Sequence, residues 1–218
     1  MNWVLAAMVS YALGGINSAI AVSWLLHRDD IRRHESRNAG ASNMFRTYGR
    51  TAALLTLFGD VLKTFAAVAF TRLLFRGIAG VDPGFDPGWF AGLFAILGHV
   101  FPIWFGFRGG KGVLVAAVTV LAVDPTAFGV MLVFAVAVFS LWRTMSIVSL
   151  ASAAMLPIVI FVLGLFRHQA VWAEVLFALA YALLVLWSHR DNIRRIRTGE
   201  EQPLREAGRD SKEPADHS

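Results

Sequence analysis

The 218-residue sequence contains no cysteine and few charged residues. Without cysteine, the chain has no disulfide, no thiolate nucleophile and no cysteine-bound metal. Only 16% of its residues are charged, whereas 56% are hydrophobic and 12% are aromatic. Soluble domains carry about a quarter charged residues, and a single core of this size would not bury so much apolar surface. The composition excludes a soluble enzyme, a coiled coil and a disordered chain, and it predicts an all-α, polytopic membrane protein.

Seven apolar segments are expected to be helices, because unpaired backbone polar groups cannot face lipid. These segments cover residues 3–26, 51–76, 89–105, 113–123, 126–142, 147–166 and 170–187. The fourth is too short to span a bilayer alone, since a span needs about 20 residues. It meets the fifth at Asp124 and Pro125, which fits either two short helices at a tight turn or one re-entrant hairpin. A bundle of seven transmembrane helices is predicted, with six as the alternative.

The positive charges predict the orientation of the bundle. No Lys or Arg precedes Arg28, so the N-terminus lacks the basic region of a cleaved signal peptide, and the first helix is expected to be retained. Sixteen of the twenty Lys and Arg residues lie in segments that seven spans place on one side. That side should be cytoplasmic, with the N-terminus outside and the C-terminus inside. Residues 1–201 are expected to form one membrane-embedded domain, and the polar segment 202–218 a disordered cytoplasmic tail.

Four polar groups on the predicted cytoplasmic side are candidates for a functional site. The loop 36–46 combines hydroxyls, amides, small residues and two arginines, which suits an anion because arginine binds phosphate through two N–H groups. A solvated loop of the positive-inside kind is the alternative. Asp60 and Lys63 lie three residues apart and share one helical face. Ionisable residues at membrane depth mark function by default, although a charge-neutralising structural pair fits equally well.

The third and fourth groups flank later helices. The turn 106–112 holds four glycines and Lys111 before a helix N-terminus, an arrangement suited to phosphate, although a tight structural turn is the simpler alternative. It is not a Walker A loop, because Gly112 stands where Ser or Thr is needed. His189 and Asn192 lie three apart, so both can point at one ligand; a basic segment that meets lipid headgroups is the alternative. Together the four groups predict a small phosphorylated substrate with an apolar partner from the bilayer.

These motifs resemble those of the bacterial acyl-phosphate:glycerol-3-phosphate acyltransferase family, over all of the chain except its tail. The family patterns G-S-G-N-x-G-A-T-N-x-x-R, D-x-x-K, G-H-x-x-P…F-x-G-G-K-G-V and H-R-x-N-I-x-R…G-x-E correspond to segments that begin at Glu35, Asp60, Gly98 and His189. The resemblance implies a seven-helix bundle in the bacterial inner membrane with a cytoplasmic active site. It implies acyl transfer from acyl phosphate to the 1-hydroxyl of sn-glycerol 3-phosphate, without acyl-CoA or acyl carrier protein as the direct donor.

The resemblance also implies roles for individual residues. The expected catalytic residues are His189, Asn192 and Ser36. The expected substrate- and phosphate-binding residues are Asn38, Ser42, Asn43, Arg46, Arg50, Gly109, Gly110, Lys111 and Ser149. Asp60, Lys63 and His99 are expected to support the site. Either His189 or the substrate's own phosphate would take the hydroxyl proton. No metal, cofactor or nucleic-acid partner is expected, and the acyl-phosphate-forming enzyme is a further candidate partner.

Two departures from the family pattern bear on the substrate. Glu35 and Arg37 stand where the family has glycine, which permits a positive φ or a close approach of the backbone to phosphate. These changes indicate a divergent member, and they leave open another polar acceptor or a loss of catalysis. A transporter or binding protein for a phosphorylated solute is a further alternative. The sequence shows no inverted repeat of the kind that transporters use.

Overall fold

The computed structural model of this protein describes residues 2–78, 80 and 82–201, and the predicted tail at 202–218 lies outside this range. Within it every regular element is a helix. Five helical segments are long and apolar enough to cross a membrane, and α9 with α10 makes a sixth if this bent pair is one span. The expectation of an all-helical protein with several membrane spans is therefore confirmed at this level.

The helices follow one another along the chain with short connections. They are α1 (Asn2–Gly15), α2 (Ser18–His27), η1 (Ile31–Arg33), α3 (Ala41–Tyr48), α4 (Arg50–Arg72), η2 (Leu73–Ile78), α5 (Gly88–Val100), η3 (Ile103–Phe105), α6 (Val113–Val123), α7 (Pro125–Trp142), α8 (Met145–Phe166), α9 (Trp172–Ser188) and α10 (Arg190–Thr198). Of these, η1 and η3 are short 3-10 turns, and η2 continues α4 as a π-helix.

The first apolar segment is broken into α1 and α2, where the sequence predicted one continuous helix. Asn17 begins α2 as its N-cap, and its side chain accepts a hydrogen bond from the Ile20 amide at 3.1 Å. Just before the break, α1 lies in backbone contact with α5. A Cβ atom at Gly14 would lie 2.2 Å from the Ala95 carbonyl oxygen, and one at Gly98 would lie 2.1 Å from that of Tyr11. Only glycine permits this approach of the two helices.

The fourth and fifth apolar segments form two helices, α6 and α7, that meet at a single residue. Asp124 accepts a hydrogen bond from the Ala127 amide at 3.0 Å, and Pro125 occupies the first turn of α7, where its missing N–H costs nothing. The Asp124 carboxylate also binds the Arg167 guanidinium at 2.6 Å. The turn between α6 and α7 is thereby tied to the connection between α8 and α9.

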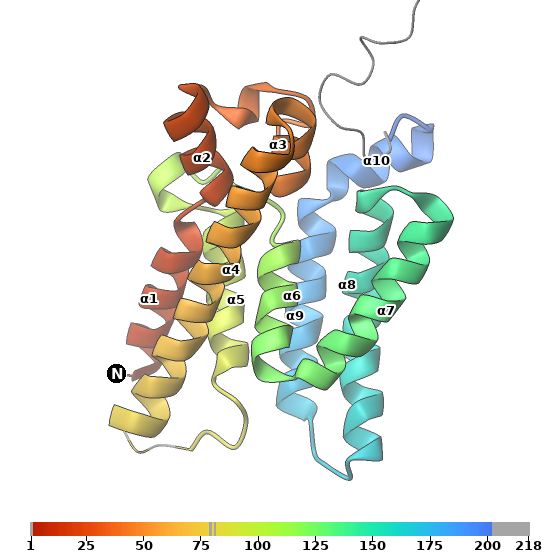
Figure 1. Ribbon diagram of the computed structural model, residues 1–218. Coiled ribbons are helices and arrows are strands. Elements are labelled where there is room, and N and C mark those ends of the chain that lie inside the picture. The colour runs from red at the N-terminus through yellow and green to blue at the C-terminus, as the bar shows by residue number, and fades with distance from the viewer. Residues whose placement is uncertain (1, 79, 81, 202–218) are drawn as a thin grey trace, which may run out of the picture.

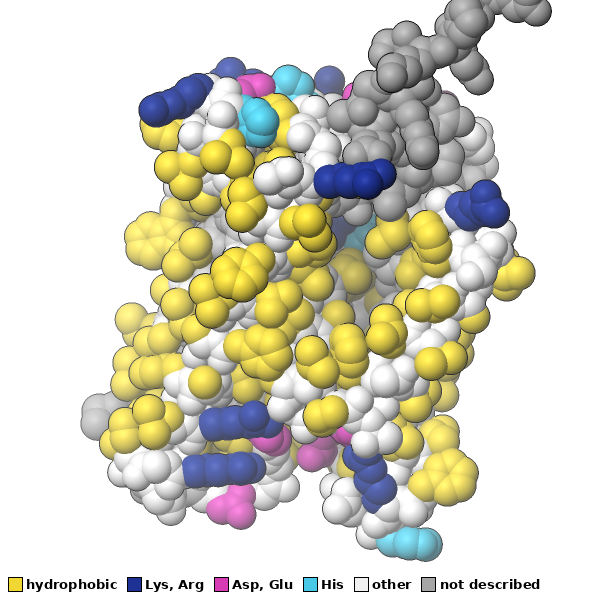
Figure 2. All heavy atoms as spheres, in the orientation of Figure 1, with side chains coloured by type: hydrophobic (Ala, Val, Ile, Leu, Met, Phe, Trp, Pro, Cys, Tyr) yellow, Lys and Arg dark blue, Asp and Glu magenta, His cyan; other side chains and the backbone are white. Residues whose placement is uncertain are grey.

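The long helices run up and down between two polar ends of the bundle. Figure 1 shows α4 to α9 running in alternating directions, with the start of α1 and the end of α10 at opposite ends. Figure 2 shows hydrophobic side chains over the middle of the molecule and charged side chains at its two ends. The loop between α2 and α3, the turn after η3, and α10 all lie at the same end (Figure 1). This end brings three of the four polar groups of the sequence into one region, whereas Asp60 and Lys63 lie further along α4.

Candidate active site

A polar pocket of about 340 Å³ opens at the α10 end of the bundle. Besides Val100 and Phe101 at the end of α5, three separate stretches of chain line it and supply its polar residues. They are the loop before α3 (Ser36, Arg37, Asn38), the Gly-rich turn (Phe107, Arg108, Gly109, Gly110, Lys111) and the α9–α10 junction (Ser188, Arg190, Asp191, Asn192, Arg195). The pocket therefore joins segments that lie about 150 residues apart in the chain, and its wall carries more cations than anions.

Lys111 and Asn192 form the centre of a hydrogen-bond network in this pocket. The Lys111 ammonium donates to the Asn192 side-chain oxygen at 2.5 Å. The Asn192 amide in turn donates to Ser146 Oγ and to Glu201 Oε1, both at 2.7 Å. Glu201 also accepts from the Ser146 hydroxyl and from Arg195 Nε, the latter at 2.7 Å. Because Asn192 is only 3% exposed, these partners hold its amide in one orientation.

The electrostatic surroundings adjust the charges of this network. Burial lowers the pKa of Lys111 to about 8, and the nearby Glu201 carboxylate partly opposes this effect by favouring the cation. Burial acts to raise the pKa of Glu201, but the hydrogen bonds from Ser146, Arg195 and Asn192 outweigh burial and lower it. At neutral pH the site therefore holds a carboxylate and an ammonium that titrates just above neutrality.

His189 lies at the end of α9, just behind the wall of the pocket. It is 2% exposed, and its Nδ1 lies 2.8 Å from the Val185 carbonyl oxygen. A carbonyl only accepts hydrogen bonds, so Nδ1 carries the proton and Nε2 keeps a free lone pair. The adjacent Ser188 hydroxyl lies 3.0 Å from the Lys111 carbonyl oxygen, within hydrogen-bond distance. The α9 terminus and the Gly-rich turn are thus joined at the pocket.

Gly109 and Gly110 let the Gly-rich turn lie against the end of α5. Their amides donate to the carbonyl oxygens of Val100 and His99 at 3.1 and 3.0 Å. A Cβ atom at Gly109 would lie 2.0 Å from the His99 carbonyl oxygen, and one at Gly110 would lie 2.1 Å from His99 Nε2. A side chain at either position would overlap with His99, so this packing requires glycine at both. Both glycines also form part of the pocket wall.

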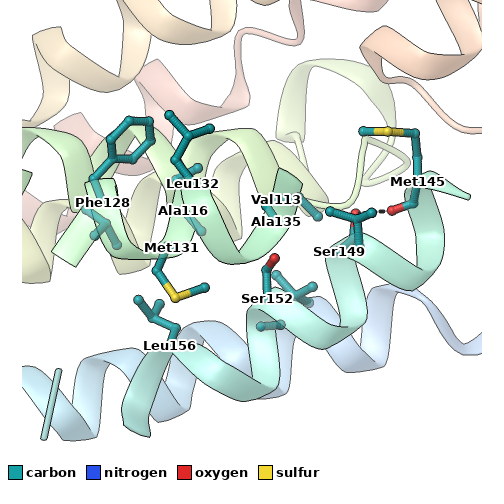
Figure 3. Close-up of a pocket in the computed structure, with 15 residues that line it drawn as sticks. Val113, Ala116, Phe128, Met131, Leu132, Ala135, Met145, Ser149, Ser152 and Leu156 are labelled. Atoms are coloured by element: carbon teal, nitrogen blue, oxygen red, sulfur yellow. Dashed lines mark hydrogen bonds between the residues drawn. The ribbon is translucent and has the colours of Figure 1, made fainter. Parts of the chain in front are cut away.

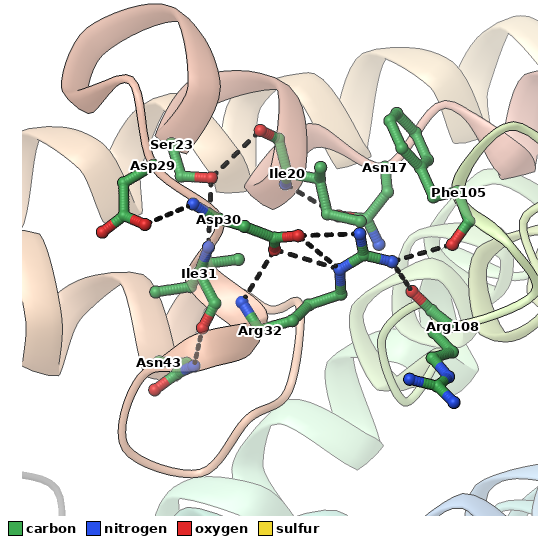
Figure 4. A network of polar contacts seen from close by, with 10 residues as sticks. All are labelled: Asn17, Ile20, Ser23, Asp29, Asp30, Ile31, Arg32, Asn43, Phe105 and Arg108. Carbon is green, nitrogen blue, oxygen red and sulfur yellow. Dashed lines mark hydrogen bonds and ion pairs between the residues drawn. The ribbon is translucent and has the colours of Figure 1, made fainter.

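Arg32 ties the loop after α2 to the same turn (Figure 4). Its guanidinium forms a two-pronged contact with Asp30 at 2.8 to 3.1 Å. It also donates to the carbonyl oxygens of Phe105 and Arg108, at 2.7 and 3.0 Å. Arg32 therefore fixes the position of the loop between α2 and α3 relative to the Gly-rich turn. These are two of the three stretches that supply the polar lining of the pocket.

The residues predicted around α3 lie in different environments. The amide of Asn43, which is 1% exposed, lies 3.0 to 3.1 Å from the carbonyl oxygens of Ile31, His34 and Asn38, an arrangement that shapes the loop. Arg46 lines a neighbouring polar pocket of about 460 Å³ and lies 3.4 Å from the Ser42 carbonyl oxygen. Ser36 borders both pockets, whereas Arg50 starts α4.

Asp60, Lys63 and His99 form a buried cluster beneath the pocket. Lys63 Nζ lies 2.7 Å from Asp60 Oδ1, 2.9 Å from His99 Nδ1 and 2.9 Å from the Ile16 carbonyl oxygen. That carbonyl is one that the break between α1 and α2 leaves unpaired. Ser18 donates to Asp60 at 2.8 Å. The cluster connects the helix break, α4 and the end of α5, so it can support the Gly-rich turn without reaching the pocket.

An apolar cavity of about 180 Å³ lies next to the polar pocket, between α6, α7 and α8 (Figure 3). Val113, two residues after Lys111, and Met145, next to Ser146, line one end, and Phe128 and Leu156 line the other. Ser149, predicted to contact substrate, faces this cavity, and its hydroxyl donates to the Met145 carbonyl at 2.8 Å. The site thus combines a basic pocket with an adjoining apolar one.

Three residues of the network were not among the predicted site residues. Arg195 and Glu201 carry a sequence signal, since both belong to the motif that begins at His189. Ser146 carries none, because only the fold brings the start of α8 beside α10. The structure also shows Glu35 and Arg37 with φ of 43° and 55°, at the two positions where the family pattern has glycine.

The fold and this site define an integral membrane protein with a basic pocket open at one polar end and an apolar cavity beside it. The sequence matches the glycerol-3-phosphate acyltransferase family over residues 4–199, and the chain belongs to that family.

Individual relatives agree with this assignment. The chain is 35% identical over 206 residues to a glycerol-3-phosphate acyltransferase of Coxiella burnetii, which covers 94% of this chain and 100% of the relative. It is 34% identical over 197 residues to that of Syntrophomonas wolfei, covering 90% and 94%. It resembles the crystal structure of PlsY (YgiH), an integral membrane glycerol 3-phosphate acyltransferase, in its glycerol 3-phosphate form. The TM-score is 0.80 at 28% identity, with 94% and 96% of the chains covered.

Proposed function

We propose that this protein transfers an acyl group from acyl phosphate to the 1-hydroxyl of sn-glycerol 3-phosphate, releasing lysophosphatidic acid and inorganic phosphate. Membership of the glycerol-3-phosphate acyltransferase family supports the acceptor and the reaction class. The observation that carries the proposal is that the basic pocket around Lys111 lies near the apolar cavity, one end of which begins at Val113, two residues further along the chain. A phosphorylated headgroup and a fatty acyl chain need these two environments side by side.

In this proposal the basic pocket holds phosphate and the apolar cavity holds the acyl chain. Lys111, with Arg108 and Arg195 on the same wall, supplies charged donors for phosphate oxygens. Asn192 is held by Ser146 and Glu201, so its amide and the ammonium of Lys111 stay oriented before substrate arrives. Ser36 also lines the pocket and is contributed by a different segment of the chain.

The acceptor's 1-hydroxyl oxygen forms a bond to the acyl carbonyl carbon, and the bond from that carbon to the phosphate oxygen breaks. The hydroxyl proton goes either to the departing phosphate or to Nε2 of His189, whose Nδ1 proton is held by Val185. In the second version the fixed tautomer makes Nε2 the acceptor of this proton. Binding both substrates in one site supplies proximity, and no covalent enzyme intermediate is needed.

We further propose that the chain crosses the bacterial inner membrane seven times and that the pocket faces the cytoplasm. The six longer candidate spans and the 11-residue α6 together supply seven crossing elements. The α10 end holds most of the arginines, which supports its placement on the cytoplasmic side and that of the N-terminus outside. An enzyme that forms acyl phosphate would then supply the donor from the cytoplasmic side.

The test is a turnover assay with purified protein in lipid or detergent. Palmitoyl phosphate and labelled glycerol 3-phosphate are expected to yield lysophosphatidic acid, and palmitoyl-CoA as a parallel donor is expected to yield none. Lys111→Ala should raise the KM for glycerol 3-phosphate about tenfold, because one charge-assisted phosphate contact is lost. His189→Ala should mainly lower kcat. No product from either donor, in protein shown to be folded, would refute the proposed activity and favour a binding or transport role.

A further inference from the structure

Arg37 occupies a backbone conformation that arginine disfavours. Its φ of 55° lies in the left-handed region, where the Cβ atom of an L-residue is crowded by the backbone. The family pattern has glycine at this position, as described above, and glycine adopts this conformation freely. Because Arg28 shares this strain with a φ of 54°, the case for a function at Arg37 rests on what surrounds its side chain.

The Arg37 side chain lies where three polar pockets meet. It lines the pocket around Lys111, the neighbouring pocket that Arg46 lines, and a third, outer pocket of about 630 Å³ between the loop after α2 and the Gly-rich turn. It is exposed, and within the described residues its guanidinium makes no hydrogen bond or ion pair. All five of its N–H donors are therefore available to a ligand.

The outer pocket has an excess of positive charge. Arg32 and Asp30 line it but neutralise each other through their two-pronged contact. Arg33, Arg37 and Arg108 remain, and within the described part of the chain none of the three side chains has an acidic partner. Glu35, two residues from Arg37, lines only the pocket shared with Arg46. Such a concentration of unpaired cations in a concave surface attracts an anion.

We propose that Arg37 binds the phosphate of the acceptor where the outer pocket meets the catalytic pocket, and so selects phosphorylated acceptors in a way that a glycine at this position would not. The inference rests on the proposed function for the identity of the acceptor. A guanidinium binds two phosphate oxygens at once, which matches a phosphate monoester. The contact is made in the ground state and the transition state alike, so it should change affinity rather than the chemical step.

The experiment measures binding and turnover separately. Equilibrium binding of glycerol 3-phosphate to detergent-solubilised protein, without acyl donor, is compared for the wild type and Arg37→Gln. The variant should bind about tenfold more weakly, and kcat at saturating substrate should stay within about threefold of the wild type. Arg28→Gln is the matched control, because Arg28 has the same left-handed backbone (φ 54°), is exposed near the start of the same loop, and lines none of the three pockets.

A second variant separates the charge from the backbone strain. Arg37→Gly removes the charge and relieves the strain, so it should lose affinity to the same extent as Arg37→Gln while gaining thermal stability. Arg37→Lys should recover part of the affinity. Unchanged affinity in Arg37→Gln, or absence of glycerol 3-phosphate binding by the wild type, would overturn the inference. Charge-dependent binding without turnover would leave the inference standing and would refute only the proposed activity.

Discussion

Glu201 is expected to set the pH range in which the pocket binds phosphate. Its carboxylate reaches Lys111 through the Asn192 amide, by successive hydrogen bonds of 2.7 and 2.5 Å. Burial lowers the pKa of Lys111 to about 8, and the Glu201 charge opposes that effect. A group with a depressed cationic pKa loses its proton as the pH rises through that value. Phosphate binding should therefore weaken above about pH 8.

Glu201→Gln removes the charge and keeps most of the side-chain shape. Two charges about 6 Å apart at an effective dielectric constant of about 20 interact by about 3 kcal/mol. The Glu201 network also reaches the surface, where solvent screens the interaction. About half of this energy, about 1.4 kcal/mol, therefore remains, and it equals about one pKa unit. The alkaline limb of kcat/KM for glycerol 3-phosphate should move about one pH unit lower.

The assay is a pH–rate profile with the acyl donor saturating. Glu174→Gln, at the start of α9 and far from the pocket, serves as the matched control and should leave the profile unchanged. The Glu201 variant also leaves Arg195 with a weaker partner, so thermal unfolding must show that it is folded. An alkaline limb that stays in place in folded Glu201→Gln would show that the Lys111 ammonium does not control binding.

Three further changes test the support around the site. Asp60→Asn leaves the Lys63 ammonium buried without its counter-charge, so thermal unfolding should show a loss of about 3–5 kcal/mol of stability. The double variant with Lys63→Met should recover much of that loss. Gly110→Ala drives a methyl group into His99 Nε2, so both kcat and the melting temperature should fall, and unchanged values would mean that the turn can move away. The buried Ser152 hydroxyl has no hydrogen-bond partner among the described residues, so Ser152→Ala should stabilise the protein by about 1 kcal/mol. A loss of stability in thermal unfolding would show that this hydroxyl does make a hydrogen bond.

The membrane bundle was predictable from the sequence because its apolar segments have the lengths that a bilayer requires. Several boundaries were not predictable. The break between α1 and α2 depends on Asn17 accepting a hydrogen bond from the backbone and on α5 lying against Gly14. Neither contact changes the hydropathy of the segment. The junction of α6 and α7 was placed at Asp124 and Pro125, where the two apolar segments meet, but the sequence left open whether it is a tight turn between two helices or a re-entrant hairpin.

The site was predictable to the extent that its residues cluster in motifs. The pocket brings together Ser36, Lys111 and Asn192, as the combined motifs suggested, and their catalytic and binding roles stay predictions. Motif membership did not distinguish residues that line the pocket from residues that shape it. Asn43 lies among three backbone carbonyl oxygens, and Ser149 faces the apolar cavity. Ser146 joins the network only through tertiary contact between α8 and α10, which no local pattern encodes.

The glycine contact between α1 and α5 has a consequence for how the protein responds to bilayer thickness. Two helices that touch through their backbones cannot slide or tilt past each other without steric overlap, and Gly98 is directly followed by His99, on which the Gly-rich turn rests. In α7, by contrast, only 17% of the span is buried against other helices. Hydrophobic mismatch would therefore tilt α7 first. The pocket around Lys111 would keep its depth in any membrane, while the width of the apolar cavity between α6, α7 and α8 would change with bilayer thickness.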